Sequence, residues 1–299
     1  ASKSGACRRY ESSGLAAAQA YALEVSVLTR LNERPRNASG ACRGRYFPRL
    51  LRRDDAGLSL LQSHEGERIV TAWWHGRNPR ARIAIVSNIQ EQSKKIIATI
   101  KSYVEKSDQL REVFPHLKPG GKWTETLIAV ERDGNIKEPS VQAFGANGKI
   151  TGARLDLVII DDIHGEENVG SKDARDKLYT WFYSTIVSRL SRDAQVIFVG
   201  NAWHPDDLLH RLEREGWMTR RFPVVVTPEL TQNWPKDKLA IGDSTWPERW
   251  PSDRIAEIQV GTEDVPPIPP TEFARAYMCV ARDDQPLLRA LASVQTLHA

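Results

Sequence analysis

Two adjacent carboxylates, Asp161 and Asp162, follow a strongly apolar run that starts at Leu155. The run predicts a strand buried on both faces, and ligands of open α/β sheets bind at the C-terminal ends of such strands. Adjacent strand residues point to opposite faces, so the two acids can have separate tasks. One can hold Mg²⁺ while the other polarises an attacking water, as in nucleotide hydrolysis. The alternative is an Asp-rich turn in which one aspartate caps the next helix.

A second apolar run, 195–200, leads into Asn201, Trp203 and His204. A proline and two aspartates at 205–207 predict that a helix begins at the proline. Asn201 is therefore expected at the same sheet edge as the two acids, where it could sense a γ-phosphate or hold a water. The alternative makes Asn201 a turn residue, Trp203 a core residue and His204 a cap. His204 has no His or Cys partner at metal-ligand spacing.

A phosphate-binding loop should join a strand to a helix near the start of the sheet. The candidate loop is 62–68, between a predicted strand at 58–61 and a helical stretch at 69–74. Its candidate nucleotide-binding residues are His64, Gly66 and Arg68. A P-loop has Gly-Lys-Ser/Thr, but here Glu67 follows the glycine; it would repel phosphate, and Arg68 cannot ligate Mg²⁺. The loop is therefore a degenerate one, and whether its backbone N–H groups bind phosphate is left open.

From Leu58 onward, short β-branched runs alternate with helical periods. This predicts an α/β fold with a mostly parallel sheet and helices on both faces. The predicted strands are 58–61, 83–87, 127–130, 141–143, 157–161, 196–200 and 219–226. The predicted helices are 13–31, 90–106, 172–190 with Ser171 as N-cap, and a short one through Phe273 and Tyr277.

The composition is that of a globular protein: 299 residues, 40% hydrophobic and 27% charged. It excludes disorder, collagen and coiled coil as descriptions of the whole chain. The longest apolar runs are of strand length, so no membrane span is expected. The three cysteines are widely scattered, which favours a reducing cytosol over a disulfide framework.

The net charge of +4 is unevenly distributed. Residues 1–53 hold 11 Lys and Arg against three acids, which leaves 31 against 35 for the rest. Such a basic segment can neutralise phosphates, or it can be a solvated tail. We expect a basic, weakly ordered segment at 1–57, an α/β domain at 58–227 and a Trp- and Pro-rich linker region at 228–299.

The order of these motifs resembles the large subunit of tailed-phage terminases. The resemblance covers roughly residues 58–284. The residues that carry it are the loop 62–68, Arg77-Asn78-Pro79-Arg80-Ala81-Arg82, Gly152-Ala153-Arg154 followed by the strand to Asp162, Glu166-Glu167-Asn168, Trp181-Phe182, 199–208, Trp246-Pro247-Glu248-Arg249-Trp250, Phe273-Ala274-Arg275-Ala276-Tyr277 and Ala281-Arg282-Asp283-Asp284.

The resemblance implies an ASCE P-loop NTPase fold and an ATP-driven motor that moves double-stranded viral DNA into a procapsid. It implies ATP and Mg²⁺ as ligands, a small terminase subunit and a portal protein as partners, a ring of subunits, no membrane, and the host cytoplasm as location. Asp161 would be the Walker B aspartate on Mg²⁺, and Asp162 would stand at the catalytic carboxylate. Asn201, Trp203 and His204 would form the motif that couples hydrolysis to movement, and Arg154 would approach a phosphate or be a surface charge.

The sequence departs from the family at two places. The phosphate loop lacks the lysine and the hydroxyl residue, so a non-catalytic, diverged assembly or DNA-binding protein, such as a prophage remnant, is the alternative to an ATPase. The family's nuclease half would begin just past Asp284, where 15 residues remain. We therefore expect no DNA cleavage by that mechanism.

Overall fold

The computed structural model describes residues 26–30, 71–72, 74–134, 136–150, 154–228 and 240–281. The chain divides into two compact units. In the described part, the first unit contains 29–163 and 177–197, and the second contains 24–28, 164–176 and the residues from 198 onward. The predicted strand at 58–61 and the loop 62–68 lie outside the described residues.

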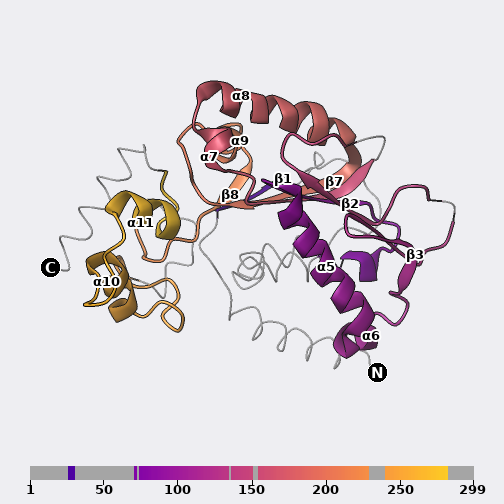
Figure 1. Cartoon of the computed structure of the whole chain (residues 1–299), viewed down its shortest axis with the longest axis horizontal. Coiled ribbons are helices and arrows are strands. Elements are labelled where there is room, and N and C mark those ends of the chain that lie inside the picture. The colour runs from indigo at the N-terminus through magenta and orange to yellow at the C-terminus, as the bar shows by residue number, and fades with distance from the viewer. Residues whose placement is uncertain are drawn as a thin grey trace, which may run out of the picture. The chain divides into compact units, whose positions relative to one another are not determined.

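The first unit is built on a mixed sheet whose strands follow the order β3-β4-β5-β2-β6-β7 (Figure 1). The strands are β2 (Ile83–Ser87), β3 (Pro119–Trp123), β4 (Leu127–Val130), β5 (Val141–Gly145), β6 (Leu155–Asp161) and β7 (Leu190–Gly200). In the centre, β2 runs parallel to both β5 and β6, whereas β3, β4 and β5 pair antiparallel at the edge. The predicted α/β fold with a mostly parallel sheet is confirmed.

The central strands are buried because they carry apolar side chains on both faces. All five residues of β2 are buried, and β6 is buried from Leu157 to Asp161. The predicted bounds of β2 and β4 are those observed, while β6 and β7 begin earlier than predicted. The structure also adds β3, whose Pro-Gly-Gly start gives no apolar signal in the sequence.

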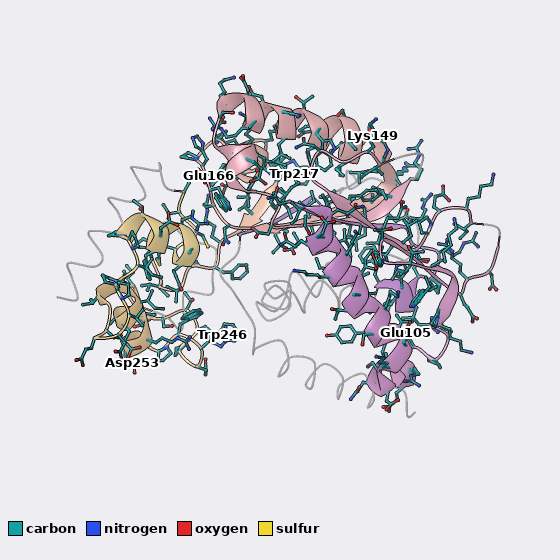
Figure 2. The ribbon with its side chains drawn as sticks, viewed as in Figure 1. Glu105, Lys149, Glu166, Trp217, Trp246 and Asp253 are labelled. Atoms are coloured by element: carbon teal, nitrogen blue, oxygen red, sulfur yellow. The ribbon has the colours of Figure 1, made fainter. Side chains whose placement is uncertain are left out.

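Helix α5 (Gln90–Lys106) has the predicted bounds and packs on β2 and β5. Its core side chains recur every three or four residues, as an amphipathic helix requires: Ile96, Ile97, Ile100 and Val104. A short helix, α6 (Asp108–Val113), follows, with the Ser107 side chain as its N-cap. Glu105 on α5, labelled in Figure 2, accepts a hydrogen bond from the indole N–H of Trp123 on β3.

The helix predicted for 172–190 is wrong beyond its first half. In the structure, this segment comprises α8 (Lys172–Trp181), a π-helical turn (Phe182–Ile186) and a 3₁₀ turn (Val187–Arg189), and β7 begins at Leu190. In an α-helix, side chains four residues apart differ by about 40° in direction around the helix axis. In a continuous α-helix, Leu178, Phe182 and Ile186 would therefore turn progressively away from the core. The wider π turn offsets this drift, and the three side chains are at most 1% exposed. Ser171 is the N-cap as predicted, since its Oγ accepts from the Ala174 N–H at 3.1 Å.

The second unit contains the end of β7, then the first three residues of β1 (Ser26–Arg30) and β8 (Met218–Arg220) in that order. Its helices are α7 (Glu166–Val169), α9 (Leu208–Arg214), α10 (Ser252–Val260) and α11 (Pro270–Tyr277). A hydrophobic cluster from Trp250, Ile255, Phe273 and Met278 packs α10 against α11, and Trp246, labelled in Figure 2, packs on it. The predicted helix through Phe273 and Tyr277 is confirmed as α11.

Three predicted elements of this unit are corrected. Within the predicted helix 13–31, residues 26–30 form the strand β1 instead, because tertiary pairing outweighs local helical spacing there, and the rest of that range lies outside the described residues. The predicted strand 219–226 is reduced to β8, after which Val225 forms only an isolated bridge with Ser244. The helix predicted to begin at Pro205 begins at Leu208, because the Asp207 side chain caps it.

His75 lies in a helical stretch before β2 and is 1% exposed. Burial, with a smaller contribution from the positive charge of Arg132, lowers its pKa from 6.5 to about 4. The ring is therefore neutral in the folded protein at neutral pH.

A membrane-spanning helix needs a long apolar stretch, and none of the helices among the described residues has one.

We expect His75 to make the fold sensitive to acid. The unfolded chain takes up this proton below about pH 6.5, whereas the folded protein takes it up only near pH 4, so stability falls as the pH drops between these values. The full loss is about 3 kcal/mol. In urea denaturation of wild type and His75→Gln from pH 7.5 to 4, the wild type should lose stability relative to the variant by this amount. A constant difference across that range would contradict the assignment.

Candidate functional site

Three parallel strands of the first unit end at one edge of the sheet. In the register, Ser87 at the end of β2 lies opposite Gly145 on β5 and Asp161 on β6. Asp161 is the last residue of the buried strand β6 and is itself 3% exposed. This is the edge at which α/β sheets bind ligands.

Asp162 follows directly, with a φ of 45° in the left-handed region. Asp and Asn adopt this conformation more readily than most residues other than glycine. The backbone therefore turns sharply after β6, and the half-buried Asp162 is the first residue outside the strand. The two acids occupy one sheet edge in different backbone conformations.

The first turn of α5 fixes the neighbouring part of this edge. The Ser93 hydroxyl contacts that of Ser87 at 3.0 Å and donates to the Phe144 carbonyl at 2.7 Å. Gln90 Nε2 donates to the Ala143 carbonyl at 3.1 Å. A Cβ on Gly145 would lie 2.9 Å from the Gln90 nitrogen, so only glycine permits this close approach. The edge beside Asp161 is thus held by hydrogen bonds from α5 to β2 and β5.

Arg154 lies at the other end of β6. It is exposed and precedes the strand, whereas Asp161 is its last residue, roughly 20 Å along an extended chain. Beside it, Asp156 accepts from the backbone N–H and Nε of Arg82, each at 2.9 Å, and from Ser191 at 2.8 Å. Burial opposes ionisation of Asp156, but these hydrogen bonds lower its pKa. The structure does not bring Arg154 to the two acids, and His64, Gly66 and Arg68 are outside its described residues.

The loop after β7 belongs to the second unit. Asn201 is half-buried at its start, and the Trp203 indole stacks on the Arg275 guanidinium at 4.5 Å. The Asp206 N–H donates to Nδ1 of His204 at 2.9 Å, so this ring nitrogen is an acceptor in a turn. The predicted proximity of Asn201 to Asp161 stays a prediction.

Asp207, which the sequence placed only in a helical first turn, is the centre of a buried cluster. It is 0% exposed, caps α9, and accepts hydrogen bonds from His210 and from the loop after β7. His164 Nδ1 lies 3.8 Å from its Oδ2. An aspartate just before the apolar residues of α9 was the signal for the cap, but His164 is distant in the sequence and gives none.

The buried carboxylate and its neighbours shift the pKa values of Asp207 and His164. Burial opposes the charge on Asp207, but His164 and the hydrogen bonds from His210 outweigh it and hold the pKa of Asp207 well below its ordinary value. Burial lowers the pKa of His164, and Asp207 offsets this only in part. Asp207 is therefore a carboxylate in the folded protein.

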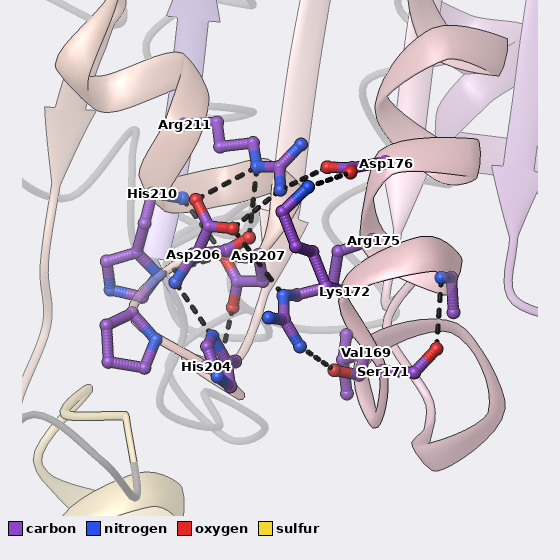
Figure 3. A network of polar contacts seen from close by, with 12 residues as sticks. Val169, Ser171, Lys172, Arg175, Asp176, His204, Asp206, Asp207, His210 and Arg211 are labelled. Carbon is purple, nitrogen blue, oxygen red and sulfur yellow. Dashed lines mark hydrogen bonds and ion pairs between the residues drawn. The ribbon is translucent and has the colours of Figure 1, made fainter.

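The neighbouring Asp206 joins a second, more exposed network (Figure 3). Its carboxylate accepts from Arg211 at 2.6 Å and lies 3.6 Å from Nε of Arg175 on α8. Arg211 also pairs with Asp176 on α8 at 2.7 Å. These ion pairs connect α8 to α9, so the consecutive aspartates have different structural roles.

The two acids at the end of β6 fit a magnesium–nucleotide site by their donor chemistry. Among the described residues, no three His, Cys, Asp or Glu side chains are grouped to hold a metal ion. Mg²⁺ in nucleotide sites needs only one or two carboxylates, because phosphate oxygens and waters supply the other ligands. A pair of acidic residues is thus the donor set expected there.

The comparisons with known proteins agree with the predicted resemblance. No family model matches the sequence. The large terminase subunit of Enterobacteria phage T3 is 27% identical over 177 residues, which are 58% of this chain and 29% of that protein. The chain thus spans less than a third of the length of this relative.

Two solved structures are also similar in part. The large terminase ATPase domain of Thermus phage P74-26 matches with a TM-score of 0.45 and 18% identity over 72% of this chain and 82% of that one. A point mutant of the same domain matches with a TM-score of 0.45 and 17% identity over 73% of this chain and 84% of that one. On the evidence of the phage T3 relative, the resemblance of this chain to the large subunit of tailed-phage terminases is confirmed.

Proposed function

We propose that this chain is the ATPase module of a phage DNA-packaging terminase, which couples ATP hydrolysis to translocation of double-stranded DNA. One observation carries the proposal: β6 ends in Asp161, directly followed by Asp162, at the edge where the parallel strands β2 and β5 also end. Similarity in sequence to a phage terminase large subunit supports it. By the same similarity, we propose a small terminase subunit and a portal protein as partners, in a ring of subunits.

At this edge, Asp161 would hold Mg²⁺, which when bound neutralises phosphate charge. Asp162 would orient and polarise the attacking water, since its carboxylate comes from the turn outside the strand. The hydrogen bonds from α5 to β2 and β5 would keep the edge rigid during turnover. Asn201, Trp203 and His204 would form the loop that responds to loss of the γ-phosphate.

The second candidate is an assembly or DNA-binding protein that has kept the fold and lost nucleotide binding. The sequence Gly66-Glu67-Arg68 favours it, because a carboxylate replaces the lysine of a phosphate loop. Under this reading the two acids would be parts of a turn and the protein would act only through its surfaces.

An assay of phosphate release from ATP separates the two candidates. We expect hydrolysis that requires Mg²⁺, is lost with a chelator, and increases when double-stranded DNA is added. Glu67→Lys, which restores the charge of the phosphate loop, should lower KM for ATP. Absence of Mg²⁺-dependent hydrolysis in both proteins, with and without DNA, would favour the assembly protein.

DNA affinity is expected to depend on the basic N-terminal segment. Because β1 lies in the sheet, deletion of 1–53 would remove a strand, so charge-neutralising changes are preferable. Gln in place of Arg43, Arg45, Arg49, Arg52 and Arg53 should lower the magnitude of the slope of log K against log salt by up to about 4.5 units, if each arginine neutralises one phosphate. Fluorescence anisotropy with duplex DNA at several salt concentrations measures the slope. An unchanged slope would place the DNA contacts elsewhere.

A further inference from the structure

Asp207 makes more hydrogen bonds than a helix cap requires. Its Oδ1 accepts from the backbone N–H of His210 at 3.0 Å, which is the ordinary N-cap contact of α9. The same oxygen contacts Nδ1 of the His210 ring at 2.8 Å, which must donate because an ionised carboxylate only accepts. Oδ1 of Asp207 therefore binds only groups of α9.

The other oxygen serves the loop after β7. Oδ2 accepts from the N–H group of Trp203 at 3.0 Å and from that of His204, labelled in Figure 3, at 3.1 Å; both residues precede the helix. Hydrogen bonds to a charged acceptor are stronger than neutral ones, and this acceptor is fully buried. The conformation of the loop is therefore fixed by a side chain that stands outside it.

His164 brings a second segment to the same carboxylate. Its ring is 1% exposed, lies 3.8 Å from Asp207 Oδ2 and packs on Phe198 with 5.6 Å between ring centroids. Along the chain, His164 follows Asp162 by two residues. The segment that leaves the acid pair and the loop that leaves β7 thus meet at one buried charge within the second unit.

The loop also contacts the C-terminal part of this unit. The Trp203 indole stacks on Arg275 of α11, and the Arg275 guanidinium is held by Glu272 at 3.0 and 3.1 Å. A change in the loop would therefore reach α11 through a cation–π contact. Asp207 fixes the backbone of Trp203, the residue whose indole makes this contact.

We propose that Asp207 is a positioning residue that joins the loop 201–204 to the segment following the acid pair, so that the two move as one body. The inference rests on the proposed ATPase function, in which this loop responds to the nucleotide. Asp207 does not touch the nucleotide in this role; it determines whether a change at His164 reaches Trp203. An N-cap alone would require only the His210 contact.

Asp207→Ser separates the two roles, with Asp206→Ser as the matched control. A serine Oγ can still cap α9 through the His210 N–H, but it has one short acceptor and cannot also bind the two loop amides. Residue-resolved amide exchange by NMR on the full chain should show protection kept at His210 and exchange about ten-fold or more faster at Trp203 and His204. Asp206→Ser should leave these amides unchanged, because the Asp206 carboxylate bonds to arginines instead.

Steady-state kinetics give the functional readout. Asp207→Ser should lower kcat for ATP by about ten-fold or more with KM unchanged, because the acid pair is intact and only the coupled step is lost. Unchanged exchange at Trp203 and His204, equal loosening in Asp206→Ser, or an unchanged kcat in the loosened variant would each overturn the inference. If wild type hydrolyses no ATP while the exchange pattern is as expected, the proposed function fails and the positioning of the loop by Asp207 stands.

Discussion

Replacing Asp161 with alanine should weaken Mg²⁺-dependent ATP binding by about 100-fold or more. The metal would lose its buried carboxylate, and the triphosphate would lose the charge compensation that the metal supplies. Titration of a fluorescent ATP analogue with and without Mg²⁺ measures the effect. Because Asp161 is buried, Asp161→Asn serves as a second variant that keeps the side-chain volume while removing the charge.

Asp193→Ala is the matched control for this experiment. Asp193 is an exposed aspartate in the first half of β7, so the change removes the same charge from the same unit without touching the edge at Asp161. Its nucleotide affinity should equal that of wild type. Wild-type affinity in both Asp161 variants, or the same loss in Asp193→Ala, would show that Asp161 holds no nucleotide-bound metal.

Asp162→Asn should lower the rate of ATP hydrolysis by about 10²- to 10⁴-fold while ATP affinity changes little. The substitution removes the carboxylate that polarises the attacking water, and this range is typical for the loss of a general base. Asparagine tolerates the left-handed conformation of this residue, so the backbone turn is retained. Single-turnover hydrolysis under saturating Mg²⁺ and ATP isolates the chemical step.

Asp162→Gly is the companion variant, because glycine relaxes the positive φ and also lacks the carboxylate. Equal rate losses in the two variants would assign the effect to the missing charge. Hydrolysis at the wild-type rate in Asp162→Asn would remove Asp162 from the mechanism and leave the role of base to another group.

The parts of the fold that follow from local pattern could be predicted from the sequence. The bounds of β2 and α5 agree with the sequence pattern. A strand buried on both faces is a continuous apolar run, and a helix buried on one face has apolar residues every three or four positions. β1 and the π turn at Phe182–Ile186 could not be predicted, because one depends on pairing with distant strands and the other on the drift of core positions around a helix. Neither leaves a periodic pattern.

The same division applies to the site. The position of Asp161 at the end of a parallel strand follows from an apolar run that ends in an acid, and the structure places it there. The Asp207 cluster depends on a contact with His164, which is remote in the sequence, and on complete burial of a residue type that is mostly exposed. The wrong start of α9 at Pro205 concealed the cap, because it placed Asp207 inside the first turn instead of before it.

Paramagnetic NMR with Mn²⁺ in place of Mg²⁺ tests most directly whether the sheet edge binds a metal–nucleotide. With ATP present, substoichiometric Mn²⁺ should broaden the amide signals of Ser87, Gly145 and Asp161, which the strand register places side by side. The signal of Arg82, at the opposite end of β2, should stay sharp. Broadening centred on other residues, or none at this edge with millimolar ATP, would contradict the account.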